Sequence, residues 1–238
     1  MAFGNDGITH NRFLRFALVF TTILSLSMMW IRVSSYPSML RLPGATALLV
    51  EVAALLLLYG AVLFWGAGLA SPKLLLQGTT IGLIAGLVQI IHLLSEHFVS
   101  FSGAWNGAIT LAFMLTTFML WGVTGFIAAR SGQATPTGIW LAVWSAVVTM
   151  TIVVAAGFAL EFFLSPTPPE SMLAWPEFKR SGWTDVHAFA IANTLDSAFS
   201  HLLISPVVAA IVGKVGSMLG SVLRNSSRSK TAPSDLTS

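Results

Sequence analysis

The chain has 238 residues, of which 55% are hydrophobic and only 9% charged, and its net charge is +3. Soluble domains carry about 25% charged residues, so this composition indicates a protein of the lipid bilayer. The absence of cysteine excludes disulfides, thiolate metal sites, iron–sulfur clusters and cysteine nucleophiles. The small positive excess lies at the two ends of the chain and does not indicate binding to nucleic acid.

The apolar residues fall into six long blocks. A β-barrel would show segments of about ten residues with alternating polarity, which this sequence lacks. Because lipid leaves no other way to satisfy the backbone, the blocks predict an all-α fold, a polytopic membrane helix bundle with six transmembrane helices. The predicted spans are 13–33, 44–69, 73–99, 104–129, 138–164 and 186–213. They belong to one domain, residues 1–223, followed by a disordered basic tail, residues 224–238.

The Lys and Arg residues predict the orientation of the bundle. On the side of the two termini lie Arg12, Arg15, Lys73, Arg130, Lys214, Arg224, Arg228 and Lys230. On the other side lie Arg32, Arg41, Lys179 and Arg180. The larger group is expected inside the cell, so both termini are predicted to be cytoplasmic. The expected location is a plasma membrane, such as the inner membrane of a bacterium.

The first two spans carry little chemistry. Arg12 and Arg15 before an apolar run resemble a signal peptide, but the run is long and no Ala-x-Ala site follows. We therefore expect a retained helix. Glu51 in the second span lies about two turns from the outer boundary; it either pairs with Arg41 or belongs to a polar path.

The third span combines a packing face with a polar face. Gly78, Gly82 and Gly86 form small-xxx-small motifs, which predict close packing against another helix, a partner helix or a second copy. Toward the outer end, Gln89, His92 and Glu96 continue the stripe at helical spacing. An ionisable pair inside a span is costly and is a functional-site hypothesis by default. The alternative is a structural His–Glu hydrogen bond.

Imidazole and carboxylate four residues apart also suit zinc, iron or manganese. Two ligands do not make a site, so a metal would need a further carboxylate. Glu161 in the fifth span is one candidate, which gives His92, Glu96 and Glu161 as a predicted ligand set. The loop that follows, residues 165–185, is predicted to be an interfacial connector or a lid over an outer cavity.

The sixth span is the most polar at depth. Asn193, Asp196 and Ser200 share one helical face, and Ser197, His201 and Ser205 share the adjacent face. Pro206 inside this span is expected to kink the helix. Kinked helices with polar groups near the midplane are common in transporter sites.

Depth separates some alternatives. His92 and His201 differ by about 12 Å in depth, which disfavours a haem held by both histidines. The acids and histidines instead form a series that descends from the outer side.

The sequence therefore predicts an integral membrane protein that transports a small solute or ion, with proton coupling. Asp196 would be the midplane carboxylate, His92 and Glu96 the outer gate, and His201 the inner relay. The remaining predicted path residues are Asn193, Gln89 and Glu51. One alternative is a membrane enzyme that uses a divalent metal; no other cofactor is predicted. The second is a non-catalytic subunit that docks through its glycine stripe. The expected partners are the lipid bilayer and the solute.

Overall fold

The computed structural model describes residues 6–41, 43–98, 104–164, 173 and 176–230. The described residues contain six helices that are long and apolar enough to cross a membrane, so the predicted six-span, all-helical fold is confirmed. The six are α1 (Asp6–Ser35), α2 (Ala45–Trp65), α3 (Pro72–Phe98), α4 (Ala104–Arg130), α5 (Thr135–Ala159) and α7 (Val186–Lys230). This arrangement is consistent with a multi-pass integral membrane protein.

Four short elements complete the described chain. They are the 3₁₀ helices η1 (Pro37–Arg41) and η2 (Gly66–Leu69), the π-helical turn η3 (Leu160–Leu164) and helix α6 (Pro176–Ser181). Turn η3 follows α5 directly and carries Glu161. Most of the first half of the predicted outer loop, residues 165–172 and 174–175, lies outside the described residues.

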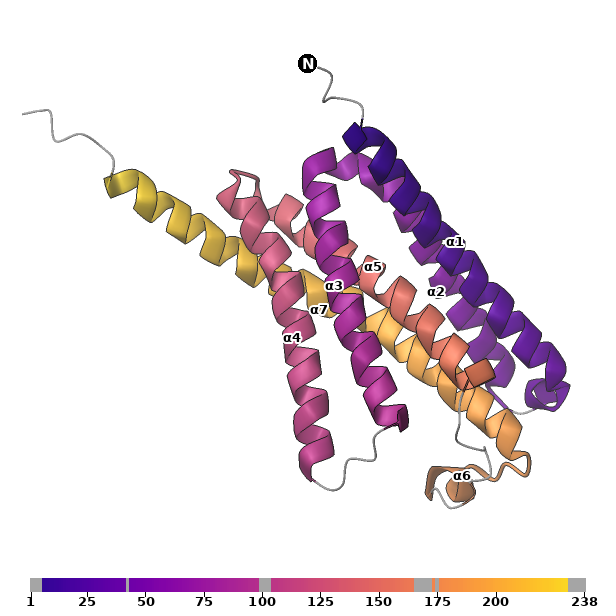
Figure 1. Ribbon diagram of the computed structural model, residues 1–238. Coiled ribbons are helices and arrows are strands. Elements are labelled where there is room, and N and C mark those ends of the chain that lie inside the picture. Colours follow the sequence, from indigo (N-terminus) through magenta and orange to yellow (C-terminus); the bar gives the residue numbers. More distant parts are fainter. Residues whose placement is uncertain (1–5, 42, 99–103, 165–172, 174–175, 231–238) are drawn as a thin grey trace, which may run out of the picture.

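Two helices end at positions that the sequence did not predict. Helix α2 ends at Trp65, because the chain tightens into η2 over the residues expected to finish the span. Helix α7 continues through Pro206 to Lys230, well past the predicted end at Gly213. Residues 224–230, predicted as part of a disordered tail, are therefore helical, and residues 231–238 lie outside the described residues. The last part of α7 projects beyond the other helices (Figure 1).

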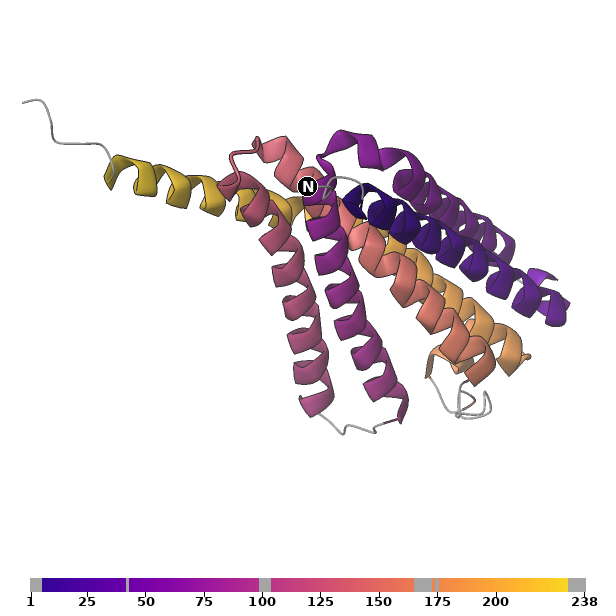
Figure 2. The same ribbon diagram turned by 45° about the horizontal axis from the view of Figure 1, so that its top comes forward.

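Helix α5 lies at the centre of the bundle and is the most buried span. The hairpin of α3 and α4 packs on one side of it, and the hairpin of α1 and α2 on the other. Two views show that α3 and α4 lie close to α5 and α7 at one end and diverge from them toward the other (Figures 1 and 2). We call these the closed end, which carries Arg130 and Thr135, and the open end, which carries Phe98 and Val186.

Glycines bring the helices together at the closed end. A Cβ atom on Gly125 of α4 would run into the backbone of Gly213 of α7, and one on Gly216 would run into Gly122. The Ser217 hydroxyl of α7 donates to the carbonyl of Gly125, with an O–O distance of 3.2 Å. Small residues let backbones approach in this way, so α4 and α7 cross in direct backbone contact.

The predicted glycine stripe of α3 packs against α5 of the same chain. A Cβ atom on Gly82 would lie 2.6 Å from the carbonyl oxygen of Ser145. The Thr149 hydroxyl of α5 donates to the carbonyl of Gly82 at 3.0 Å and accepts from the Trp121 indole N–H of α4 at 3.2 Å. One threonine thus links three helices. Gly78 and Gly86 also face α5, so α5 covers the whole stripe.

Candidate functional site

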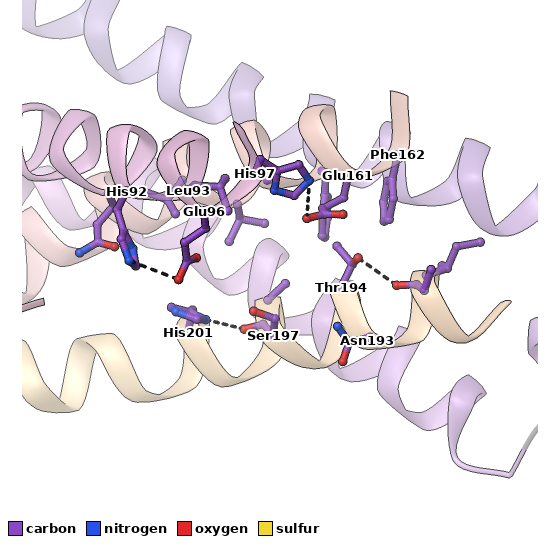
Figure 3. A pocket seen from close by; sticks show the side chains of 18 of the residues that line it. His92, Leu93, Glu96, His97, Glu161, Phe162, Asn193, Thr194, Ser197 and His201 are labelled. Atoms are coloured by element: carbon purple, nitrogen blue, oxygen red, sulfur yellow. Dashed lines mark hydrogen bonds and ion pairs between the residues drawn. The ribbon is translucent and has the colours of Figure 1, made fainter. Parts of the chain in front are cut away.

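A cavity of about 660 Å³ lies between α3–α4 and α5–α7 toward the open end. Helix α1 completes its lining, and all of its lining residues belong to the six spans. The polar lining residues are Arg32, Gln89, His92, Glu96, His97, Thr110, Glu161, Asn193, Thr194, Ser197 and His201. Figure 3 shows side chains from α3, η3 and α7 directed into this space. The volume is within the range of about 300–1,000 Å³ that is usual for small-molecule sites.

Two walls of the cavity, on α3 and on α7, consist of residues that share one face of their helix. Gln89, His92 and Glu96 of α3 share one face and line the cavity, as does Thr110 on the facing helix α4. On α7 the lining face is Asn193, Ser197 and His201, at steps of four residues. Five of the seven predicted path residues therefore line one cavity.

The wall formed by α3 and α4 is tied by hydrogen bonds. The His92 Nε2 atom lies 3.4 Å from the Glu96 carboxylate and 3.2 Å from the Thr110 hydroxyl, which also reaches Glu96 at 3.4 Å. One turn deeper, the Gln89 amide donates to the Thr117 hydroxyl at 2.7 Å. These contacts fix the orientation of His92, whose ring is buried against Phe113.

A second His–Glu pair joins α3 to η3. The His97 Nε2 atom lies 3.2 Å from a carboxylate oxygen of Glu161, and the two side chains face each other in Figure 3. No role was predicted for His97, because it lies off the Gln89–Glu96 face. Glu161 was predicted as a metal ligand together with His92 and Glu96. The π turn changes the register of the last turn of α5, which hydropathy does not reveal.

The wall formed by α7 is less constrained. The His201 Nδ1 atom lies 2.7 Å from the carbonyl oxygen of Ser197 on its own helix, which leaves Nε2 of the ring facing the cavity side. His201, Ser197 and Asn193 are all exposed. These groups offer hydrogen bonds to a bound solute.

Arg32 enters the cavity from α1. Its guanidinium carbon lies 4.6 Å from the centroid of the Tyr36 ring, and its Nε atom is buried with no hydrogen-bond partner in the described residues. From the sequence, Arg32 contributed only to the predicted orientation. No periodicity could have placed it here, because the docking of α1 beside α5 decides its position.

The support for Arg32 extends to the start of α7. The Tyr36 ring stacks on His187 with centroids 5.4 Å apart and an interplanar angle of 7°. Asp185 caps α7: its carboxylate accepts from the backbone N–H groups of His187 and Ala188 at 3.0 and 3.2 Å, and from the Ser38 hydroxyl at 2.7 Å. The Ser38 hydrogen bond, followed by the backbone ones, lowers the pKa of Asp185 below its usual range.

Two predicted path residues lie elsewhere. Asp196 and Glu51 are exposed, and neither lines the cavity. Successive residues of a helix are about 100° apart, so when Ser197 faces the cavity Asp196 turns to another side of α7. Asn193 was predicted to share a face with Asp196, whereas in the structure it lines the cavity with Ser197 and His201.

The predicted metal ligands do not converge. Among the described residues, no three His, Asp or Glu side chains are placed to hold one metal ion. His92 pairs with Glu96, whereas Glu161 pairs with His97 instead.

Comparison with protein-family models, with curated proteins and with solved structures found no match.

Proposed function

We propose that the chain is a membrane transporter for a small solute and that the cavity is its solute site. One observation carries the proposal: a polar cavity within the spans adjoins the open end, while at the other end the same helices are in backbone contact. A site reached from one end of a bundle is what one state of an alternating-access cycle requires. Helix pairs that rock about the glycine contacts would supply the second state.

Proton coupling follows from the same lining. The cavity holds two His–Glu pairs, His92 with Glu96 and His97 with Glu161. Histidine and carboxylate side chains inside spans are the groups that form proton relays in membrane transporters. The pair between His97 and Glu161 joins α3 to η3. A change in the protonation of this pair would therefore change the attraction between the two walls of the cavity.

The open end is proposed to face outward. The Lys and Arg distribution supports this orientation, because eight of the twelve residues lie on the side of the closed end. The two alternative functions have less support. For a metal-dependent enzyme, the predicted ligands do not converge within the described residues. For a docking subunit, α5 of the same chain already covers the glycine stripe.

Cysteine accessibility tests the proposal without knowledge of the solute. The natural chain has no cysteine, so Ser197→Cys gives a single thiol in the cavity. A charged, membrane-impermeant thiosulfonate is added to right-side-out and to inside-out vesicles. Transport predicts labelling from both sides, in proportions that change with a proton gradient. Leu203→Cys is the matched control on the same helix, exposed but outside the cavity, and should resist the reagent.

Labelling of Ser197→Cys from one side only, with and without a gradient, would contradict transport. It would leave a binding pocket that never reaches the other side of the membrane.

A further inference from the structure

We infer that the solute is a small organic carboxylate whose carboxyl group binds to Arg32. The inference rests on the proposed function, in that it takes the cavity as the solute site. It adds the chemical class of the solute and the residue that selects it.

Arg32 is the only Lys or Arg among the lining residues. Within the described residues its guanidinium has no hydrogen bond and no ion pair. It makes a cation–π contact with the Tyr36 ring. Unpaired charge within a membrane protein is costly, and such a group usually marks a substrate site or an ion path.

Two other arginines show what this chain does with a structural guanidinium. Arg15 donates to the carbonyl of Leu63 at 3.2 Å, near the end of α2. Arg224 donates to the carbonyl of Ala129 at 2.9 Å, near the end of α4. Both arginines donate to carbonyls in the last turn of a helix, where cationic side chains commonly bind. Arg32 performs no such role, so its donors remain for a ligand.

The side chain is held in place before a ligand arrives. The guanidinium carbon of Arg32 lies over the Tyr36 ring, His187 stacks on Tyr36, and Asp185 anchors the start of α7 beside them. Within the described residues no hydrogen bond occupies the N–H groups of this guanidinium. A planar fork of donors matches a carboxylate in a bidentate arrangement.

The charge balance selects an anion over a cation. The two carboxylates in the lining, Glu96 and Glu161, each already face a histidine of α3 at 3.4 and 3.2 Å. Among the described residues, the guanidinium of Arg32 has no carboxylate partner. A carboxylate on the solute supplies it, whereas an ammonium group would add a second unpaired cation to the cavity.

The rest of the lining describes the body of the solute. Phe158, Phe162, Val154 and Leu93 also line the cavity. An apolar wall beside a single cation suits a carboxylate attached to a short aliphatic or aromatic body. The volume of about 660 Å³ accommodates such a molecule together with water.

Matched probes test the charge of the solute. Phenylacetate, phenylacetamide and phenethylamine share one aromatic body and differ in the group that would meet Arg32. We expect calorimetric titration of the full chain in detergent to show phenylacetate binding at least about tenfold more tightly than the other two. Arg32→Gln should remove that preference, and Arg32→Lys should keep part of it. Arg41→Gln, an exposed arginine at the same end and outside the cavity, should leave it intact.

Several results would overturn the inference. They are equal binding of the acid and the amide, a preference for the amine, a preference that survives Arg32→Gln in a monodisperse protein, or no binding of any probe. The outcome is separable from the transport proposal. Labelling of Ser197→Cys from both sides without a carboxylate preference would leave transport standing and remove the inference. An Arg32-dependent preference with one-sided labelling would do the reverse.

Discussion

The two ends of the bundle use opposite kinds of residue to set the distance between the same helices. At the closed end, Gly122, Gly125, Gly213 and Gly216 let α4 and α7 touch through their backbones. At the open end, polar side chains stand between the walls and enclose a cavity. Two arginines at the closed end, Arg15 and Arg224, bind helix carbonyls, whereas Arg32 has no such hydrogen bond among the described residues. We therefore expect a fixed contact at one end and an adjustable one at the other.

The largest effect is expected from a side chain added at the closed end. Gly125→Ala puts a Cβ atom against the backbone of Gly213, and backbone cannot give way as a flexible side chain does. We expect a loss of about 3 kcal/mol, measured by thermal unfolding in detergent. Gly107→Ala is the matched control on α4, where a Cβ atom would meet nothing within 4 Å. Equal melting temperatures for the two variants would remove the fixed contact from the account.

The next effect tests the hydrogen bonds that support this contact. Thr149→Val takes away the acceptor of the buried Trp121 indole N–H and the donor to Gly82. A buried donor without a partner costs about 1–3 kcal/mol. Thr151→Val is the control, because that buried hydroxyl bonds only within its own helix, to Val147. Unfolding measurements should separate the two variants, and similar losses would show that the link between helices contributes nothing.

At the open end, Asp185→Ala should cost about 1 kcal/mol through loss of the α7 cap. The pKa of this carboxyl is lowered in the folded state, chiefly by Ser38. Its charge therefore stabilises the fold fully above the ordinary aspartate pKa of about 3.9, and that stabilisation is lost as the pH falls through the lower folded value. The difference in melting temperature between wild type and Asp185→Ala should shrink from pH 7 to about pH 3. A constant difference would show that the charge does not contribute.

The smallest effect concerns the pair that spans the two walls. A double-mutant cycle of His97→Gln and Glu161→Gln should give a coupling free energy of about 0.5–1 kcal/mol, since both side chains are partly buried. The cycle for Arg180 and Glu177, whose side chains are 76% and 60% exposed, should give less. Additive losses at His97 and Glu161 would mean that the pair does not hold α3 to η3.

Hydropathy was enough to predict the six spans, because length and apolar content alone decide which segments cross a bilayer. Helical spacing also grouped Gln89, His92 and Glu96, since residues of one helix keep their relative directions in any fold. What spacing cannot give is the rotation of a helix about its axis. The glycine contacts of α7 with α4 set the rotation of α7 about its axis. That rotation directs Ser197, and not Asp196, into the cavity.

Contacts between segments far apart in the chain could not be predicted from the sequence for a related reason. Arg32 of α1 lines the cavity beside Tyr36, which precedes η1 and stacks on His187 at the start of α7. Glu161 meets His97 because the last turn of α5 is π-helical. Both depend on tertiary packing, which leaves no periodic pattern in the chain.

The most direct test of the central claim measures both ends of the bundle at once. Spin labels at Ser35 of α1 and Asn106 of α4 span the open end, and labels at Ser71 and Thr135 span the closed end; all four positions are exposed. Double electron–electron resonance in lipid nanodiscs, with and without phenylacetate and at two pH values, reports both distances. We predict two populations in which the open-end distance shortens as the closed-end distance lengthens. A single population at both ends under every condition would contradict the account.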